Sequence, residues 1–268
     1  AIKLIRPDML GDDKERASRL RAQFEREARV TAQLRSPFTI QVYDVGTTEN
    51  GTFYYVMEYL DGLDIESLVR EHGPVEGPRA IYVLKQVCQS LADAHDNRLV
   101  HRDIKPANIF LSQMGGTFDY AKVLDFGLAR PSEEQDDDGM LTGTPAYLPP
   151  ETITGEHPVG PASDIYSLGC VAYFMLTGHL VFDEKELVKV AAAHLDRTPL
   201  KPSLRTELPI AEPLEELVMR CLAKDPGDRP ADGKALLAEL VAIDREPWTE
   251  EQARDWWTKH GLATDLAA

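Results

Sequence analysis

Apolar positions recur at two different spacings, and the spacing changes near residue 61. Before that point, residues 1–5, 40–45 and 52–59 alternate in polarity or carry β-branched and aromatic runs, which is typical of strands. Residues 12–35 instead place apolar side chains three and four positions apart with charges between them, the period of an amphipathic helix. This part of the chain therefore predicts a small β-rich unit with one helix.

Helical spacing dominates the rest of the chain, with long helices predicted over 78–97 and 163–177. Between them, 99–125 is irregular, with a surface hairpin indicated by Gly115-Gly116. The segment 126–158 is loop-like and too long for an idle connection. The longest apolar stretch, 165–177, is shorter than the roughly 20 residues that cross a bilayer. We therefore expect a helical unit with functional loops and no membrane span within this chain.

Composition narrows the class of protein. The 268 residues are 43% apolar and 28% charged, which is typical of a globular chain with a sizeable core. Asp and Glu number 45 against 29 Lys and Arg, and the net charge of −16 repels phosphate backbones, so no nucleic-acid partner is expected. The three cysteines form no CxxC pair, which favours reduced thiols and a cytoplasmic protein.

Three short motifs stand in the long loops. They read His101-Arg102-Asp103-Ile104-Lys105-Pro106-Ala107-Asn108, then Asp125-Phe126-Gly127, then Pro149-Pro150-Glu151. Their order and spacing resemble the eukaryotic-type protein kinase family, and the surrounding phrases resemble its bacterial serine/threonine members. The resemblance extends from Lys3 to about Val241.

This resemblance implies an α+β fold with two lobes. Residues 1–60 would form part of the small β-rich lobe, 61–244 the large helical lobe, and 245–268 a C-terminal helical extension that holds all three tryptophans. In the extension, Thr249 and Gln252 predict a capping box at a helix start. The tryptophans are predicted to pack on the helical lobe, and a partner-binding patch is the alternative.

The family likeness also implies roles in moving the γ-phosphate of ATP. Asp103 would accept the proton of the acceptor hydroxyl and orient it, and Lys105 would reach the transferring phosphate. Thr144 would help to orient both side chains. Asn108 and Asp125 would hold Mg²⁺, which prefers hard oxygen ligands.

Further residues would bind ATP. Lys3 matches the lysine that pairs the α and β phosphates, and Glu27 matches its partner on the helix, with Glu25 as the less favoured alternative.

The segment Val56–Leu60 resembles the hinge between the lobes. Backbone groups of Glu58 and Leu60 would bind adenine, and Met57 would gate the pocket. Asp64 would contact the ATP ribose or a basic substrate residue, but a helix N-cap explains it equally well.

Other matched residues would be structural. Asp164 would hold the backbone of the catalytic loop, Glu151 would pair with Arg229, and His101 would pack around Phe126. We assign His101 no part in the chemistry.

The sequence also departs from the family. A glycine-rich loop that covers the ATP phosphates should precede Lys3, and no Gly-x-Gly-x-x-Gly occurs. We therefore expect a chain that is truncated at its N-terminus and binds ATP weakly. A membrane anchor beyond either end is an open alternative. One interpretation is a kinase that phosphorylates Ser and Thr of protein substrates with ATP and Mg²⁺. The other is an impaired pseudokinase that docks a partner.

An acidic run, 133–138, occupies the stretch where many relatives carry a phosphorylated residue. These acids would partly replace phosphate beside Arg102, or they would simply form a solvated loop. Thr142 is the nearby hydroxyl suited to phosphorylation.

Overall fold

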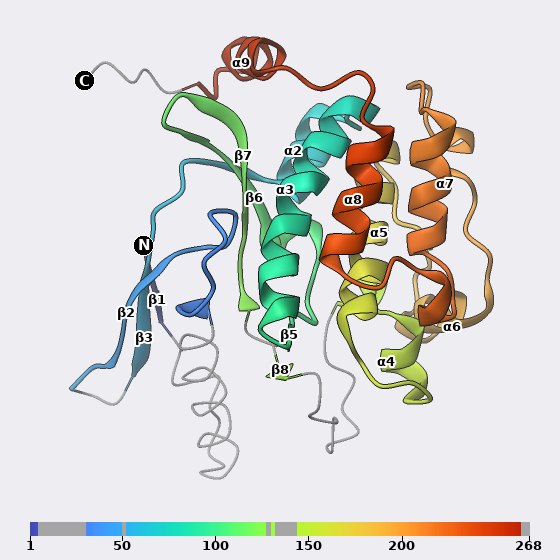
Figure 1. Ribbon diagram of the computed structural model, residues 1–268, viewed down its shortest axis with the longest axis horizontal. Coiled ribbons are helices and arrows are strands. Elements are labelled where there is room, and N and C mark those ends of the chain that lie inside the picture. The colour runs from blue at the N-terminus through green and yellow to red at the C-terminus, as the bar shows by residue number, and fades with distance from the viewer. Residues whose placement is uncertain (5–30, 50–51, 127–129, 132–143, 264–268) are drawn as a thin grey trace.

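The computed structural model describes residues 1–4, 31–49, 52–126, 130–131 and 144–263. A small sheet lies beside a larger body of helices (Figure 1). The predicted α+β architecture with two lobes is confirmed, while the lobe boundaries at residues 60 and 244 stay predictions. The predicted helix over 12–35 and the acidic run lie largely or wholly outside the described residues, as do Glu25, Glu27 and Thr142.

The small sheet is antiparallel, with the strand order β1-β3-β2. Its strands are β1 (Ile2–Leu4), β2 (Val42–Thr47) and β3 (Phe53–Met57), close to the predicted positions. The register pairs Lys3 with Tyr55 and Leu4 with Tyr54. Because side chains alternate along a strand, Lys3 and Tyr55 share one face and Tyr54 lies on the other.

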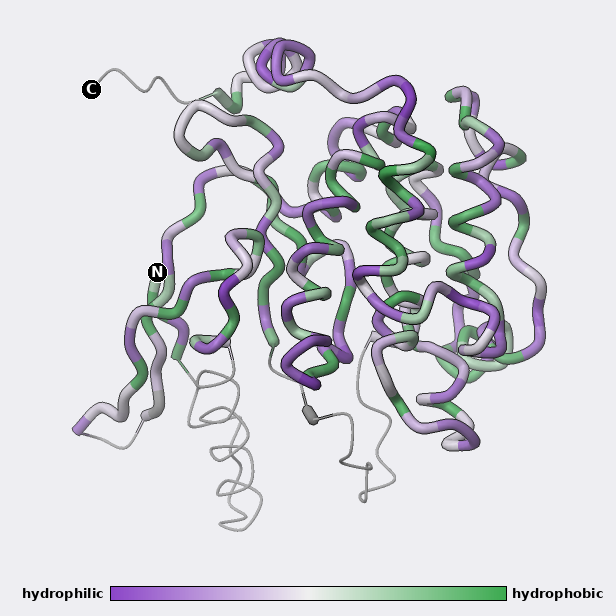
Figure 2. The backbone as a smooth tube through the Cα atoms, viewed as in Figure 1, coloured by the Kyte–Doolittle hydropathy of each residue, from purple (hydrophilic) through white to green (hydrophobic). Residues whose placement is uncertain are grey.

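The helical lobe is built around α5, which is apolar on all sides and buried along nearly its whole length. The helices are α2 (Ile65–His72), α3 (Gly77–Asp96), α4 (Pro150–Thr154), α5 (Pro161–Thr177), α6 (Leu187–Asp196), α7 (Glu212–Cys221), α8 (Gly233–Ile243) and α9 (Glu250–Lys259). Hydrophobic and hydrophilic segments alternate along α3 and α8, which lie side by side (Figure 2). Gly233 allows this contact, because a Cβ there would lie 2.7 Å from the backbone N of Ala92. Within the described ranges, no helix is long and apolar enough to span a membrane.

The prediction that residues 99–125 are irregular is wrong. This segment contains β5 (Leu99–Val100), β6 (Ile109–Met114) and β7 (Thr117–Val123), with the short 3-10 turn η2 (Pro106–Asn108) before β6. A second sheet has the order β4-β6-β7, with β4 (Gly62–Asp64) at one edge, and β5 pairs with β8 (Arg130–Pro131). Half of β6 and most of β7 are buried, so the alternation that marks a half-exposed strand is weak.

The predicted hairpin at Gly115-Gly116 is confirmed, with φ of 58° and 88° at the two glycines. Positive φ is the region that glycine enters without steric cost, which explains the glycine pair at this turn. Three further 3-10 turns complete the described elements: η4 (Pro145–Tyr147), η5 (Pro202–Leu204) and η6 (Pro226–Asp228).

The C-terminal extension packs on the helical lobe, as predicted, and α9 begins with the expected capping box of Thr249 and Gln252. Two of its three indoles, those of Trp248 and Trp257, meet Asp119 of β7, which is fully buried. Trp248 Nε1 donates to Asp119 Oδ2 at 2.9 Å, and Trp257 Nε1 donates to Oδ1 at 2.8 Å.

The same carboxylate pairs with Arg79 of α3, whose Nε and Nη2 donate at 2.9 and 2.7 Å. The Arg79 guanidinium also lies 3.9 Å from the centroid of the Trp256 ring. A buried charge pair with four hydrogen bonds on Asp119 thus joins the extension to α3 and β7.

We expect Trp257→Phe to lower the free energy of unfolding by about 1.5–3 kcal/mol, because it removes a hydrogen bond to a buried carboxylate. Urea denaturation followed by circular dichroism measures the loss. Trp256→Phe is the control, because it removes no bond to Asp119 and should cost less than about 1 kcal/mol. Equal losses in the two variants would contradict the assignment.

Candidate active site

The motif residues Asp103 and Asp125 lie on two neighbouring loops, and His101 joins one loop to the other. His101 Nε2 contacts the carbonyl of Leu124 at 2.9 Å, and the backbone N–H of Asp103 donates to His101 Nδ1 at 3.2 Å. Since Nδ1 accepts, Nε2 carries the proton and donates to Leu124. Burial lowers the pKa of His101, which favours this neutral ring. Leu124 N–H in turn donates to the carbonyl of Asn108 at 2.8 Å.

The ring of His101 also packs on Phe126, with 4.4 Å between the centroids, so the predicted packing is confirmed. His101 therefore joins the loop that carries Asp103 to the loop that carries Asp125.

Asp164, near the start of α5, holds the backbone of the first loop, as predicted. Its carboxylate accepts from the N–H groups of His101 and Arg102 at 2.8 and 2.9 Å. Arg102 has a φ of 67°, a conformation that such bonds from the surroundings can hold. A third bond comes from His95 Nε2 at 2.9 Å. Burial opposes ionisation of Asp164, but the bond from His95 and the nearby histidines lower its pKa overall.

Asp103, Lys105 and Asn108 form one cluster. Lys105 Nζ lies 2.7 Å from Asp103 Oδ2, and Asn108 Nδ2 donates to that oxygen at 2.9 Å and to the Asp103 carbonyl at 2.8 Å. Asp103 Oδ1 receives no hydrogen bond from a described residue. Within the described part of the chain, the carboxylate is thus held through one oxygen and the other is not bonded.

Asp125, with a φ of 53°, faces the small sheet. Its Oδ1 forms an ion pair with Lys3 Nζ and accepts a hydrogen bond from the Tyr55 hydroxyl at 3.3 Å. The Lys3 and Asp125 side chains are 37% and 38% exposed, so the pair is open to solvent and to a ligand. The sequence analysis did not single out Tyr55. The alternation of β3, which places Tyr55 on the face of Met57, was the available signal.

The predicted hinge, Val56–Leu60, begins with the last two residues of β3. The N–H of Met57 donates to the carbonyl of Ala1 at 2.9 Å, and the N–H of Glu58 donates to the carbonyl of Gln41 at 2.9 Å. The Glu58 side chain pairs with Lys122 of β7 at 2.7 Å, and both side chains are nearly buried. The hinge is therefore fixed to both sheets.

Two predicted site residues lie in other contacts. Both carboxylate oxygens of Asp64 bond Ser67, to its N–H at 2.9 Å and its hydroxyl at 3.0 Å, so Asp64 caps α2. No hydrogen bond joins Thr144 to Asp103 or Lys105, which are all among the described residues. The functional roles of Asp64 and Thr144 stay predictions.

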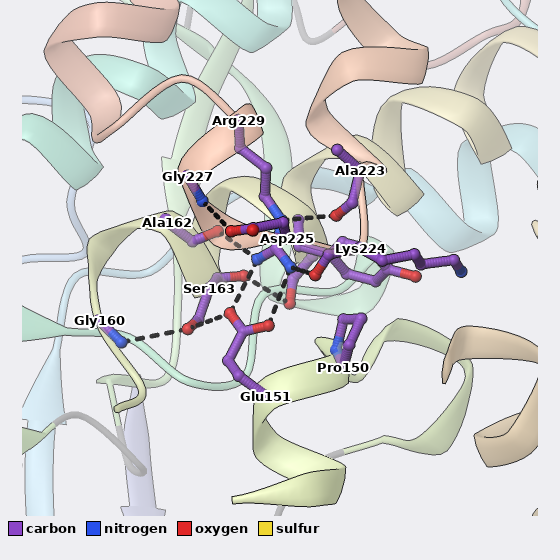
Figure 3. Close-up of polar contacts among 12 residues, drawn as sticks. Pro150, Glu151, Gly160, Ala162, Ser163, Ala223, Lys224, Asp225, Gly227 and Arg229 are labelled. Carbon is purple, nitrogen blue, oxygen red and sulfur yellow. Dashed lines mark hydrogen bonds and ion pairs between the residues drawn. The ribbon is translucent and has the colours of Figure 1, made fainter. Parts of the chain in front are cut away.

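The predicted pair of Glu151 and Arg229 is confirmed and buried (Figure 3). Arg229 Nη1 and Nη2 donate to the two carboxylate oxygens at 2.8 and 2.9 Å. The remaining N–H groups of Arg229 donate to the carbonyls of Ala162, Ala223 and Lys224. The pair fixes α4 to the core of the helical lobe.

Beneath the turn η4, which follows Thr144, His194 of α6 is fully buried and bonds the Tyr166 hydroxyl through Nδ1 at 2.8 Å. Burial, with the nearby Lys224 cation, lowers the pKa of His194 from 6.5 to about 4.

As the pH falls, His194 therefore becomes protonated in the unfolded chain at a higher pH than in the folded protein. Stability that is present above pH 6.5 should be lost as the pH falls toward 4, by roughly 3–4 kcal/mol. Urea denaturation at several pH values measures the slope, and His194→Gln should remove the contribution of His194 and make the slope smaller. His157→Gln, at an exposed position, should leave the slope unchanged; an equal change in both variants would contradict the assignment.

Comparison with known proteins decides the family. The family model described as "Protein kinase domain" matches residues 1–242. The chain belongs to the protein kinase family. The kinase domain is 36% identical over 252 residues to the serine/threonine-protein kinase pkn3 of Myxococcus xanthus, covering 91% of this chain and 45% of the relative. It is 37% identical over 250 residues to the serine/threonine-protein kinase PknB of Mycobacterium tuberculosis, covering 91% and 38%.

A probable serine/threonine-protein kinase of Corynebacterium efficiens is 32% identical over 255 residues, with 91% and 37% covered. The kinase domain thus spans less than half the length of these relatives. The resemblance drawn from the three motifs is confirmed at the level of the family and of bacterial relatives named serine/threonine kinases.

Proposed function

We propose that this kinase domain transfers the γ-phosphate of ATP to serine and threonine hydroxyls of proteins. The observation that carries the proposal is the cluster in which Lys105 and Asn108 hold Asp103 through Oδ2 and leave Oδ1 available. A carboxylate held in this way can orient an acceptor hydroxyl and take its proton as the oxygen attacks. Lys105 lies beside it as the cation that would neutralise charge on the transferring phosphate.

Asn108 and Asp125 fit a magnesium ion by their chemistry. Asn108 uses its Nδ2 toward Asp103, which leaves its side-chain oxygen, and Asp125 receives bonds from described residues only at Oδ1. The described residues contain no cluster of three or more His, Cys, Asp or Glu side chains arranged for a metal. Two protein oxygens are consistent with Mg²⁺, which is usually bound by one or two protein ligands together with substrate phosphates. Bound Mg²⁺ would neutralise phosphate charge.

The nucleotide would lie between the hinge and Lys3. The N–H of Glu58 already donates to Gln41, so the Glu58 carbonyl is the group left to accept from adenine, with Leu60 two residues on. Met57 would border the pocket at the end of β3. Lys3 would exchange Asp125 for phosphate oxygens, with Glu27 as its proposed helix partner.

The names of the relatives support serine and threonine as acceptors, and the substrates are proposed to be proteins. The test is transfer of labelled γ-phosphate from ATP to a basic protein, with Mg²⁺ and with EDTA, followed by phosphoamino-acid analysis. We expect Mg²⁺-dependent phosphoserine and phosphothreonine. Labelled tyrosine alone would overturn the acceptor class. Absence of both transfer and Mg²⁺-dependent nucleotide binding would overturn the proposal in favour of a partner-docking module.

A further inference from the structure

The backbone of the small sheet places Tyr55 beside Asp125, the carboxylate proposed to bind the metal. The antiparallel register pairs Tyr55 of β3 with Lys3 of β1, so both side chains leave the sheet on the same face. Tyr55 is only 4% exposed, and its hydroxyl reaches Asp125 Oδ1 at 3.3 Å. Lys3 Nζ pairs with the same oxygen and lies 5.7 Å from the centroid of the Tyr55 ring.

The two donors saturate one oxygen of Asp125. A carboxylate oxygen has two lone pairs, and on Oδ1 these accept from Lys3 and from Tyr55. Oδ2 receives no bond from a described residue. Among the described residues, the carboxylate is therefore held through Oδ1, and Oδ2 is the oxygen that we assign to another ligand.

The two donors would respond differently to bound nucleotide. Lys3 is positively charged, so the ATP phosphates would attract it away from Asp125, whereas they would not attract the neutral phenol of Tyr55 in this way. Asp125 also has a left-handed backbone, with a φ of 53°, which its surroundings must hold. Once nucleotide is bound, Tyr55 is the donor that stays on Asp125.

We propose that Tyr55 is a positioning residue that holds Asp125 for magnesium when the nucleotide has drawn Lys3 away. This inference rests on the proposed function, because it assigns Asp125 to the metal. The phenol acts through Asp125, to which its hydroxyl donates.

The test variant is Tyr55→Phe, which removes the hydroxyl and keeps the buried ring. The matched control is Tyr54→Phe, the adjacent tyrosine on the opposite face of β3, paired with Leu4. The probe is the β,γ-imido analogue of ATP, titrated by calorimetry at several Mg²⁺ concentrations and in EDTA. Thermal melting without ligand reports on the fold of each variant.

We expect Tyr55→Phe to weaken the Mg²⁺ dependence of analogue binding about three- to tenfold, since the bond is long for a hydroxyl donor to a charged acceptor. Binding in EDTA should stay within about twofold of the unsubstituted chain, and Tyr54→Phe should match that chain in both titrations.

Unchanged or tighter Mg²⁺ dependence in Tyr55→Phe would overturn the inference alone, provided that Asp125→Asn abolishes the dependence. Equal weakening with Mg²⁺ and EDTA would also overturn it, because a merely structural role has that signature. If the unsubstituted chain shows no Mg²⁺-dependent binding, the proposed function fails and the inference fails with it.

Discussion

Asp103→Asn is expected to lower the turnover of phosphate transfer by about 10²- to 10⁴-fold. Asparagine keeps the shape of the side chain and an oxygen that Lys105 and Asn108 can bond. It cannot take a proton from the acceptor hydroxyl, and it removes the negative partner of Lys105. The chemical step should therefore slow while the site keeps its geometry.

Steady-state kinetics with ATP and a protein substrate measure the effect, and the KM for ATP should change less than about threefold because Asp103 lies outside the proposed nucleotide contacts. The control is Asp255→Asn, the same chemical change at an exposed position of α9. Near-normal turnover in Asp103→Asn would remove Asp103 from the proposed mechanism. A fall of the same size in the control would point to a general effect of lost charge.

Arg229→Met should lower the free energy of unfolding by about 3–5 kcal/mol, because it leaves Glu151 charged and buried without its partner. The two side chains are 0% and 1% exposed, so water cannot replace the lost donors. Of its side-chain bonds to described residues, Glu151 would keep the one from the Ser163 hydroxyl, at 2.6 Å.

Chemical denaturation measures this loss, and two further variants define its cause. The double variant Arg229→Met with Glu151→Leu replaces both charges by apolar groups and should recover part of the stability of the single variant. Arg197→Met breaks an ion pair with Glu184 in which Arg197 is 57% exposed, and it should cost no more than about 1 kcal/mol. If the double variant is less stable than Arg229→Met, desolvation of Glu151 is not the cause.

Local patterns were sufficient where the chemistry or the geometry lies within a few residues. The spacing of Asp103, Lys105 and Asn108 places them in one loop, and the structure brings polar atoms of Lys105 and Asn108 within 2.9 Å of Asp103 Oδ2. The capping box of α9 and the glycine turn between β6 and β7 are equally local, and both formed as predicted.

Local sequence patterns were insufficient where two structural assignments leave the same pattern in the sequence. The strands β6 and β7 lack a clear polar face because most of their residues are buried, and they were predicted as irregular. For Asp64 the sequence left a ligand contact and a helix cap equally open. In the structure, both carboxylate oxygens of Asp64 accept bonds from Ser67, because the chain enters α2 at that point.

By itself, the sequence determined the family, the two-lobed fold and the residues that carry the proposed chemistry, since short motifs encode these directly. Only the tertiary structure decided which distant side chains converge. Tyr55 and Asp125 are 70 positions apart, and Trp257 and Asp119 are 138 apart. No local period relates such pairs, because strand register and the packing of whole elements set their distance.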